Sequence, residues 1–132
     1  MPLHTQLGAT KCTQQQQTQS LHFNCPEPIL GYEIHQGQSE YTGDLQGWQP
    51  LFAAPELGLV NRAGTLWGTY LHGLLENGAW RRHWLNRLRS RRQLPPLPTA
   101  VPHYAEQRTI ALEELTKTIM AHLNLEGICK LC

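Results

Sequence analysis

A proline-rich stretch at residues 94–102 (LPPLPTAVP) constrains the fold of this chain more than any other feature. Proline lacks a backbone N–H and fixes φ, so neither a helix nor an interior strand can continue through four prolines in nine residues. The chain is therefore expected to divide into residues 1–93, a linker at 94–103, and a C-terminal helix with its tail at 104–132.

The first third of the chain reads as two strands. Residues 5–23 are polar and rich in Gln and Thr, which favours a solvent-facing edge strand over a low-complexity linker. A turn is expected at 24–28, where two prolines restrict the backbone. Apolar and polar residues alternate over 29–35, which predicts a second strand, and residues 37–47 are expected to form a loop.

The middle of the chain is more apolar. Short apolar runs at 48–54 and 57–60 precede a turn at 61–64. The segment TLWGTYL at 65–71 is rich in β-branched and aromatic residues, which predicts a buried strand that ends at His72.

Two helices are expected to close the chain. The first has Asn77 as its N-cap and a single apolar face. That face consists of Trp80, Trp84, Leu85 and Leu88. The second runs over 104–123, where apolar residues recur every four positions, and Gly127 is its expected stop. Strands first and helices last suit the trailing part of an α/β domain.

Composition excludes few function classes. The hydrophobic content of 40% and charged content of 16% indicate a globular chain, and a net charge of +1 selects neither nucleic acid nor a membrane surface as partner. No apolar run approaches the ~18 residues needed to span a bilayer. The N-terminal residues lack a signal-peptide pattern, so a cytoplasmic setting is expected.

The chain contains four cysteines, Cys12, Cys25, Cys129 and Cys132. The last two form a C-x-x-C motif, but a structural zinc site of this kind normally has a second matched pair. We therefore expect reduced thiols and no metal site.

The junction after residues 65–71 is the strongest indication of chemistry. His72 follows a predicted buried strand, and open α/β sheets place their ligands at such strand ends. A histidine there can take a proton from a nucleophile and return it to a leaving amine. From spacing alone, a histidine that only caps the strand is the commoner arrangement, so both interpretations stay open.

Two motifs resemble the cobyric acid synthase family. GTYLHG at 68–73 is similar to the catalytic-histidine region of that family, and GYEIHQG at 31–37 is similar to a second signature. The resemblance extends in the right order over nearly the whole chain. Further similar positions are Thr5, Lys11, Leu75, Asn77, Trp80, Trp84, Tyr104, Arg108, Leu112, Leu115 and His122.

The resemblance implies an α/β fold, the trailing half of a class I glutamine amidotransferase with a flavodoxin-like open sheet and two C-terminal helices. It implies glutamine-dependent, ATP-driven amidation of corrinoid carboxylates in cobalamin biosynthesis. L-glutamine is the expected ammonia donor and His72 the expected acid-base residue of the glutaminase site. No cofactor is expected on this chain, since ATP and Mg²⁺ belong to the synthetase domain.

Two departures qualify the resemblance. Leu74 stands where most related amidotransferases have a glutamate that orients the histidine, and the cobyric acid synthase type is known for lacking that acid. None of the four cysteines lies on the glycine-flanked turn of the nucleophile, and no phosphate-binding loop occurs. We therefore expect a histidine-bearing part that is inactive alone, with an exposed strand edge. It could be a truncated product, one half of a split enzyme with an upstream synthetase polypeptide, or a non-catalytic remnant.

Four further residues are candidates for the wall of the active site: Tyr32, Glu33, His35 and Tyr70. A structural role is favoured over a chemical one for Glu33 and His35. Gly31 and Gly37 are expected to allow close backbone packing.

The first helix also contains six arginines, Arg81, Arg82, Arg87, Arg89, Arg91 and Arg92. A nucleic-acid-binding helix would look similar, but a solvated basic face is the favoured interpretation and no nucleic-acid partner is expected. The second helix is expected to dock on its own domain or on the missing half, with an interaction module as the alternative.

Overall fold

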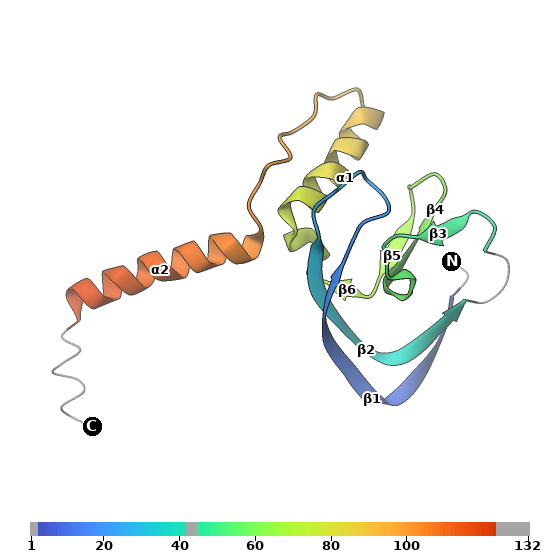
Figure 1. Ribbon diagram of the computed structural model, residues 1–132, viewed down its shortest axis with the longest axis horizontal. Coiled ribbons are helices and arrows are strands. Elements are labelled where there is room, and N and C mark those ends of the chain that lie inside the picture. Colours follow the sequence, from blue (N-terminus) through green and yellow to red (C-terminus); the bar gives the residue numbers. More distant parts are fainter. Residues whose placement is uncertain (1–2, 42–44, 124–132) are drawn as a thin grey trace.

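The computed structural model describes residues 3–41 and 45–123. Its dominant feature is a long antiparallel pair, β1 (Leu3–Thr18) and β2 (Ile29–Tyr41), to which the short strand β6 (Leu71–His72) adds in the order β1-β2-β6. A second antiparallel sheet has the order β3-β4-β5, and the long pair curves around it (Figure 1). Its strands are β3 (Trp48–Pro50), β4 (Gly58–Asn61) and β5 (Trp67–Thr69). The remaining elements are the 3₁₀ turns η1 (Pro55–Leu57) and η2 (Leu74–Glu76) and the helices α1 (Gly78–Arg91) and α2 (Tyr104–His122).

The predicted polar strand is confirmed as β1, whose residues are mostly exposed. The loop expected at 37–47 is wrong, because β2 continues to Tyr41 and pairs there with Leu3. Gly37 permits this continuation, since a Cβ on it would lie 2.6 Å from the carbonyl oxygen of Gln6. A glycine in a polar stretch here allows close strand pairing, as expected for Gly37, and does not mark a turn.

The single buried strand predicted at 65–71 is instead two strands in different sheets. The Thr69 hydroxyl donates to the Leu57 carbonyl at 2.6 Å and accepts the amide of Leu71 at 2.9 Å. These bonds divert the chain at Tyr70, so that β5 completes one sheet and β6 extends the other. Of the residues between Trp67 and His72, Leu71 alone is buried.

The mixed α/β class with two helices is confirmed, but a flavodoxin-like sheet is not what the described residues form. Every strand pair among them is antiparallel. Parallel strands need crossover connections of about a dozen residues or more. Here β1 and β2 are joined through 19–28 and β4 and β5 through 62–66, which are too short for a helical crossover.

The core is built around an aromatic cluster. Trp80 is fully buried and meets Phe23 and Trp67 edge-on, with ring centroids 5.4 and 5.5 Å apart, and stacks against Trp84 at 6.3 Å. Its indole N–H donates to the Ser20 hydroxyl at 3.1 Å, which satisfies the buried polar atom. The predicted apolar face of α1 is thus confirmed at its N-terminal end, while Leu88 remains 40% exposed.

The proline-rich stretch ends α1 as predicted and returns along it. The Asn86 side chain accepts the amide of Leu97 at 2.7 Å and donates to its carbonyl at 2.9 Å, and Arg89 donates to the Pro95 carbonyl at 2.7 Å. The stretch is therefore fastened to the helix face by side chains that satisfy its backbone.

Helix α2 confirms the prediction over 104–123 to within one residue, and the expected stop at Gly127 lies outside the described residues. None of its residues is buried, and it extends away from the two sheets (Figure 1). The expected docking on its own domain is thus not formed in this structure. Among the described residues, no helix is both long and apolar enough to cross a membrane.

Candidate active site

His72 is the last residue of β6 and is exposed. Its Nε2 lies 3.2 Å from the backbone oxygen of Ile34 in β2. A carbonyl can only accept, so Nε2 carries the proton in this contact and Nδ1 keeps its lone pair. The ring is thereby anchored at Nε2, while Nδ1 has no hydrogen-bond partner in the part of the chain that the structure describes.

The two residues after His72 turn the chain sharply into the core. Gly73 has a left-handed backbone with φ of +79°, which a glycine adopts without strain. Leu74 is then 3% exposed and belongs to the core cluster. A carboxylate at position 74 would be buried among apolar side chains. Burying an unpaired charge is costly, so this position does not suit an orienting acid.

Gly31 lets β6 approach β2 closely, as expected for this residue. A Cβ at position 31 would lie 2.5 Å from the backbone oxygen of His72 and 2.7 Å from Cγ of Leu71. The glycine of the GYEIHQG motif therefore serves the position of the histidine in the GTYLHG motif, which explains physically why the two motifs belong together.

Asn77 holds the turn after His72 against β2. It is 3% exposed and is the N-cap residue of α1, as predicted: its backbone carbonyl accepts the amide of Arg81 at 3.0 Å, but its side chain makes no capping bond to the helix. Its side chain instead accepts the amide of Leu30 at 2.9 Å and donates to the Leu30 carbonyl at 2.8 Å. It also lies within hydrogen-bond distance of the Gly73 and Leu74 carbonyls, at 3.2 and 3.0 Å.

Glu33 and His35 form a pair on β2. Nε2 of His35 lies 2.7 Å from Oε1 of Glu33, and its Nδ1 contacts the Gly37 carbonyl. Gln16 donates to the other oxygen of Glu33 at 2.7 Å, and the Tyr70 ring lies beside the imidazole with centroids 4.9 Å apart. Both ring nitrogens of His35 therefore face acceptor oxygens, an arrangement that favours a structural role.

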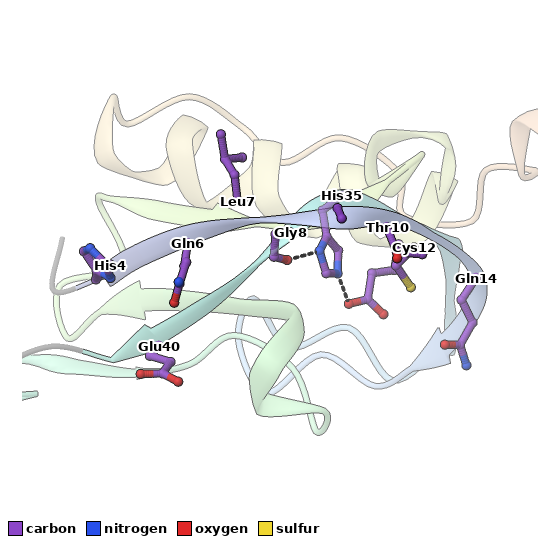
Figure 2. A pocket seen from close by; sticks show the side chains of 12 residues that line it. His4, Gln6, Leu7, Gly8, Thr10, Cys12, Gln14, His35 and Glu40 are labelled. Atoms are coloured by element: carbon purple, nitrogen blue, oxygen red, sulfur yellow. Dashed lines mark hydrogen bonds and ion pairs between the residues drawn. The ribbon is translucent and has the colours of Figure 1, made fainter.

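The predicted wall residues divide between the two faces of the sheet. Residues directly opposed in antiparallel strands share a face, and neighbours along a strand alternate. Tyr32 opposes His72, so these two side chains share one face. Glu33 and His35 lie on the other face, where they help to line a hollow of about 630 Å³ along the β1–β2 pair (Figure 2). The Tyr70 ring lies beside His35.

The cysteines within the described residues do not resemble an activated nucleophile. Cys12 is half-buried in β1 opposite His35, whose ring nitrogens are both engaged. Cys25 is 5% exposed, and burial, together with a hydrogen bond to Glu27, raises the pKa of its thiol to about 11. A thiol of that pKa is protonated at neutral pH and is a weak nucleophile. Cys129 and Cys132 lie outside the described residues.

The arginines of α1 are largely occupied by contacts within the molecule. Arg87 and Arg91 donate to the Ala63 carbonyl at 3.0 and 2.7 Å. Arg81 contacts the Leu75 carbonyl, and Arg87 also lies over the Phe23 ring at 5.5 Å. These contacts fasten turns to the helix, which supports the structural interpretation over nucleic-acid binding.

A family profile for the CobB/CobQ-like glutamine amidotransferase domain matches residues 1–80, and the chain belongs to this family. The match establishes that the chain is part of a glutamine amidotransferase domain. Cobyric acid synthases are the members of this family to which it is closely similar. The chain is 91% identical to the cobyric acid synthase of Thermosynechococcus vestitus over 132 residues, which is 100% of this chain and 27% of that protein.

Two further cobyric acid synthases show the same partial coverage. That of Synechococcus elongatus is 48% identical over 127 residues, 96% of this chain and 26% of the relative. That of Gloeobacter violaceus is 50% identical over 121 residues, 92% of this chain and 24% of the relative. The resemblance inferred from the two motifs is confirmed, and the chain spans about a quarter of the length of these relatives.

Proposed function

We propose that this chain forms part of the glutaminase domain of a cobyric acid synthase, in which His72 is the acid-base residue. The observation that carries the proposal is the setting of His72, an exposed ring at a strand end with one nitrogen anchored to the backbone of Ile34 and the other free. The identity of 91% to a cobyric acid synthase over the whole chain supplies the reaction class.

The chemistry follows that of thiol hydrolases. A cysteine thiolate attacks the side-chain amide carbon of L-glutamine, and the imidazole accepts the thiol proton and delivers it to the departing ammonia. Water then releases glutamate from the thioester, with the same imidazole as base. The ammonia is consumed at the synthetase site, where ATP with Mg²⁺ activates a corrinoid carboxylate.

The nucleophile comes from a part of the enzyme outside these 132 residues. Cys25 is buried and protonated at neutral pH, and Cys12 lies in mid-strand on the face opposite to His72. The relatives are about four times longer than the matched region, which gives room for both a nucleophile segment and a synthetase domain.

The carbonyl of Ile34 takes over the orienting task of the missing acid. Accepting the Nε2 proton fixes the tautomer and leaves Nδ1 as the basic nitrogen. A neutral carbonyl stabilises an imidazolium less than a carboxylate does, so the ring gains its orientation chiefly from β2, which Gly31 and Asn77 hold against the junction.

A hybrid enzyme tests the proposal. The matched segment of the Thermosynechococcus vestitus synthase is replaced by this chain, and ammonia release from glutamine is compared with that of the 132-residue chain alone. We expect release from the hybrid and none from the chain alone. A hybrid that folds but releases no ammonia would support the non-catalytic remnant. Ammonia release by the chain alone that thiol alkylation abolishes would place the nucleophile within it.

A further inference from the structure

A second cluster of reactive side chains lies away from His72, where the turn before β2 meets α1. Cys25, Glu27 and His83 each offer a ligand atom there, and these three atoms all lie within 4.8 Å of one another. The residues are separated by up to 58 positions in the sequence, which is why sequence spacing gave no sign of them.

The turn that presents Cys25 and Glu27 is fixed by the core. Phe23 and Asn24 have left-handed backbones, with φ of 67° and 51°, which non-glycine residues rarely adopt. The Phe23 ring packs against Trp80, one helical turn before His83. The same aromatic contact therefore sets the position of the turn and of the helix that faces it.

The three ligand groups are not committed elsewhere. Among the described residues, the Cys25 thiol forms hydrogen bonds only with Glu27, at 3.4 Å from Oε2 and 3.9 Å from the backbone oxygen. Within residues 3–41 and 45–123, the His83 side chain makes no hydrogen bond or ion pair, and it is half-buried. An uncommitted imidazole beside a thiol and a carboxylate is the donor set that Zn²⁺ prefers.

The separations suit a tetrahedral ion. Zn–N, Zn–O and Zn–S bonds of about 2.0–2.3 Å place neighbouring ligand atoms about 3.3–3.8 Å apart. The Cys25–Glu27 edge already has 3.4 Å. The edges to His83 are at most 4.8 Å, and closing them requires movements of about 1 Å by the exposed Glu27 and half-buried His83 side chains.

We propose that Cys25, Glu27 and His83 bind one Zn²⁺ ion, with water at the fourth position. Binding forms the Zn–S bond, breaks the S–H bond of Cys25 and releases that proton to solvent. The thiolate and the carboxylate balance the charge of the ion. The ion would fasten the turn at 23–28 to α1, beside the aromatic core.

The C-x-x-C motif at Cys129 and Cys132 is a competing source of thiolate ligands, so the experiment starts from the full chain with C129S and C132S. Co²⁺ titration is followed by the thiolate-to-cobalt charge-transfer band, and Zn²⁺ affinity by competition. We expect one ion per chain and a thiolate band that Cys25→Ser abolishes and Cys12→Ser leaves intact.

His83→Gln and Glu27→Gln test the other two ligands without touching the buried thiol. Each is expected to weaken Zn²⁺ binding at least tenfold, while far-UV circular dichroism stays unchanged. Zn²⁺ is also expected to raise the melting temperature of the starting chain but not of the His83→Gln variant. The proposal is overturned if the starting chain binds no metal ion, if the thiolate band survives Cys25→Ser, or if affinity is unchanged in both His83→Gln and Glu27→Gln.

Discussion

His72 and His35 lie on the same three-stranded sheet but differ in how many of their ring nitrogens face a hydrogen-bond acceptor. His72 is exposed, and within the described residues its ring makes one hydrogen bond, at 3.2 Å to a backbone oxygen. His35 has an acceptor at each ring nitrogen and an aromatic ring beside it. Both lie in motifs that resemble the same family, so a histidine in such a motif is not by that fact alone available for proton transfer.

The two rings also lie on opposite faces of the sheet. His72 opposes Tyr32, whereas Cys12 opposes His35, which is three residues further along β2 and therefore on the other face. A nucleophile supplied from elsewhere in the enzyme can therefore reach one histidine or the other from a given side, but not both. If His72 is the acid-base residue, the nucleophile must approach the sheet from the face that carries Tyr32.

Replacing His72 is expected to have the largest effect. In the hybrid enzyme, His72→Ala should lower glutamine hydrolysis by about 10²–10⁴-fold, the usual contribution of general acid-base catalysis. The matched variant His35→Gln should lower it by less than about threefold, because that ring takes part in no proton transfer. Amide synthesis with external ammonia serves as the control, since it bypasses the glutaminase site. Equal losses in the two variants would falsify the division of roles.

Gly31→Ala tests whether the second motif acts by positioning His72. The added Cβ would meet the His72 carbonyl at 2.5 Å and Leu71 at 2.7 Å, so β6 must shift away from β2. We expect about a 10–100-fold loss of glutaminase activity, because a displacement of about 1 Å has effects of that size. The control Gly8→Ala, where a Cβ meets nothing within 4 Å, should be neutral. Full activity in Gly31→Ala would show that β6 can move without cost to the site.

The sequence predicted the elements with strong local signals and missed those that depend on distant partners. Both helices and the strand beginning at 29 were correct, because apolar spacing and the proline stretch define them locally. The extension of β2 to Tyr41 depends on pairing with β1, and the division of TLWGTYL depends on Thr69 bonding to Leu57. Periodicity carries no information about either contact.

Contacts between residues far apart in the sequence also limited what could be predicted about the candidate sites. The two motifs predicted the family, which the comparisons confirm, whereas the role of His72 stays a prediction. They could not show that Glu33 and His35 face away from His72, since that follows from strand register. Nor could they show that Asn77 bridges to Leu30, a contact across 47 positions.

Weakening the Glu33–His35 pair should affect stability more than activity. Glu33→Gln removes one charge from a half-buried pair and should lower stability by about 1 kcal/mol. In the hybrid this should appear as a decrease of a few degrees in melting temperature, with glutamine hydrolysis changed less than threefold. Gln14→Ala offers a control on the same face, because Gln14 opposes Glu33 in the register and its replacement adds no charge beside the pair. A large loss of hydrolysis without loss of stability in Glu33→Gln would assign this face a chemical role.

The smallest expected effect concerns whether His35 activates the thiol opposite it. With both ring nitrogens occupied, His35 has no free base for Cys12, so the alkylation rate of Cys12 by iodoacetamide should be the same in the chain and in its His35→Gln variant. Cys25 supplies an internal reference, since a pKa of about 11 leaves about one thiol in a thousand ionised at pH 8. Its alkylation should be at least about 100-fold slower than that of Cys12 and should rise about tenfold per pH unit toward pH 11. Mass spectrometry of the alkylated peptides separates the two cysteines. Slower modification of Cys12 in the His35→Gln variant would mean that His35 acts as a base after all, and the contrast between the two histidines would then be one of degree.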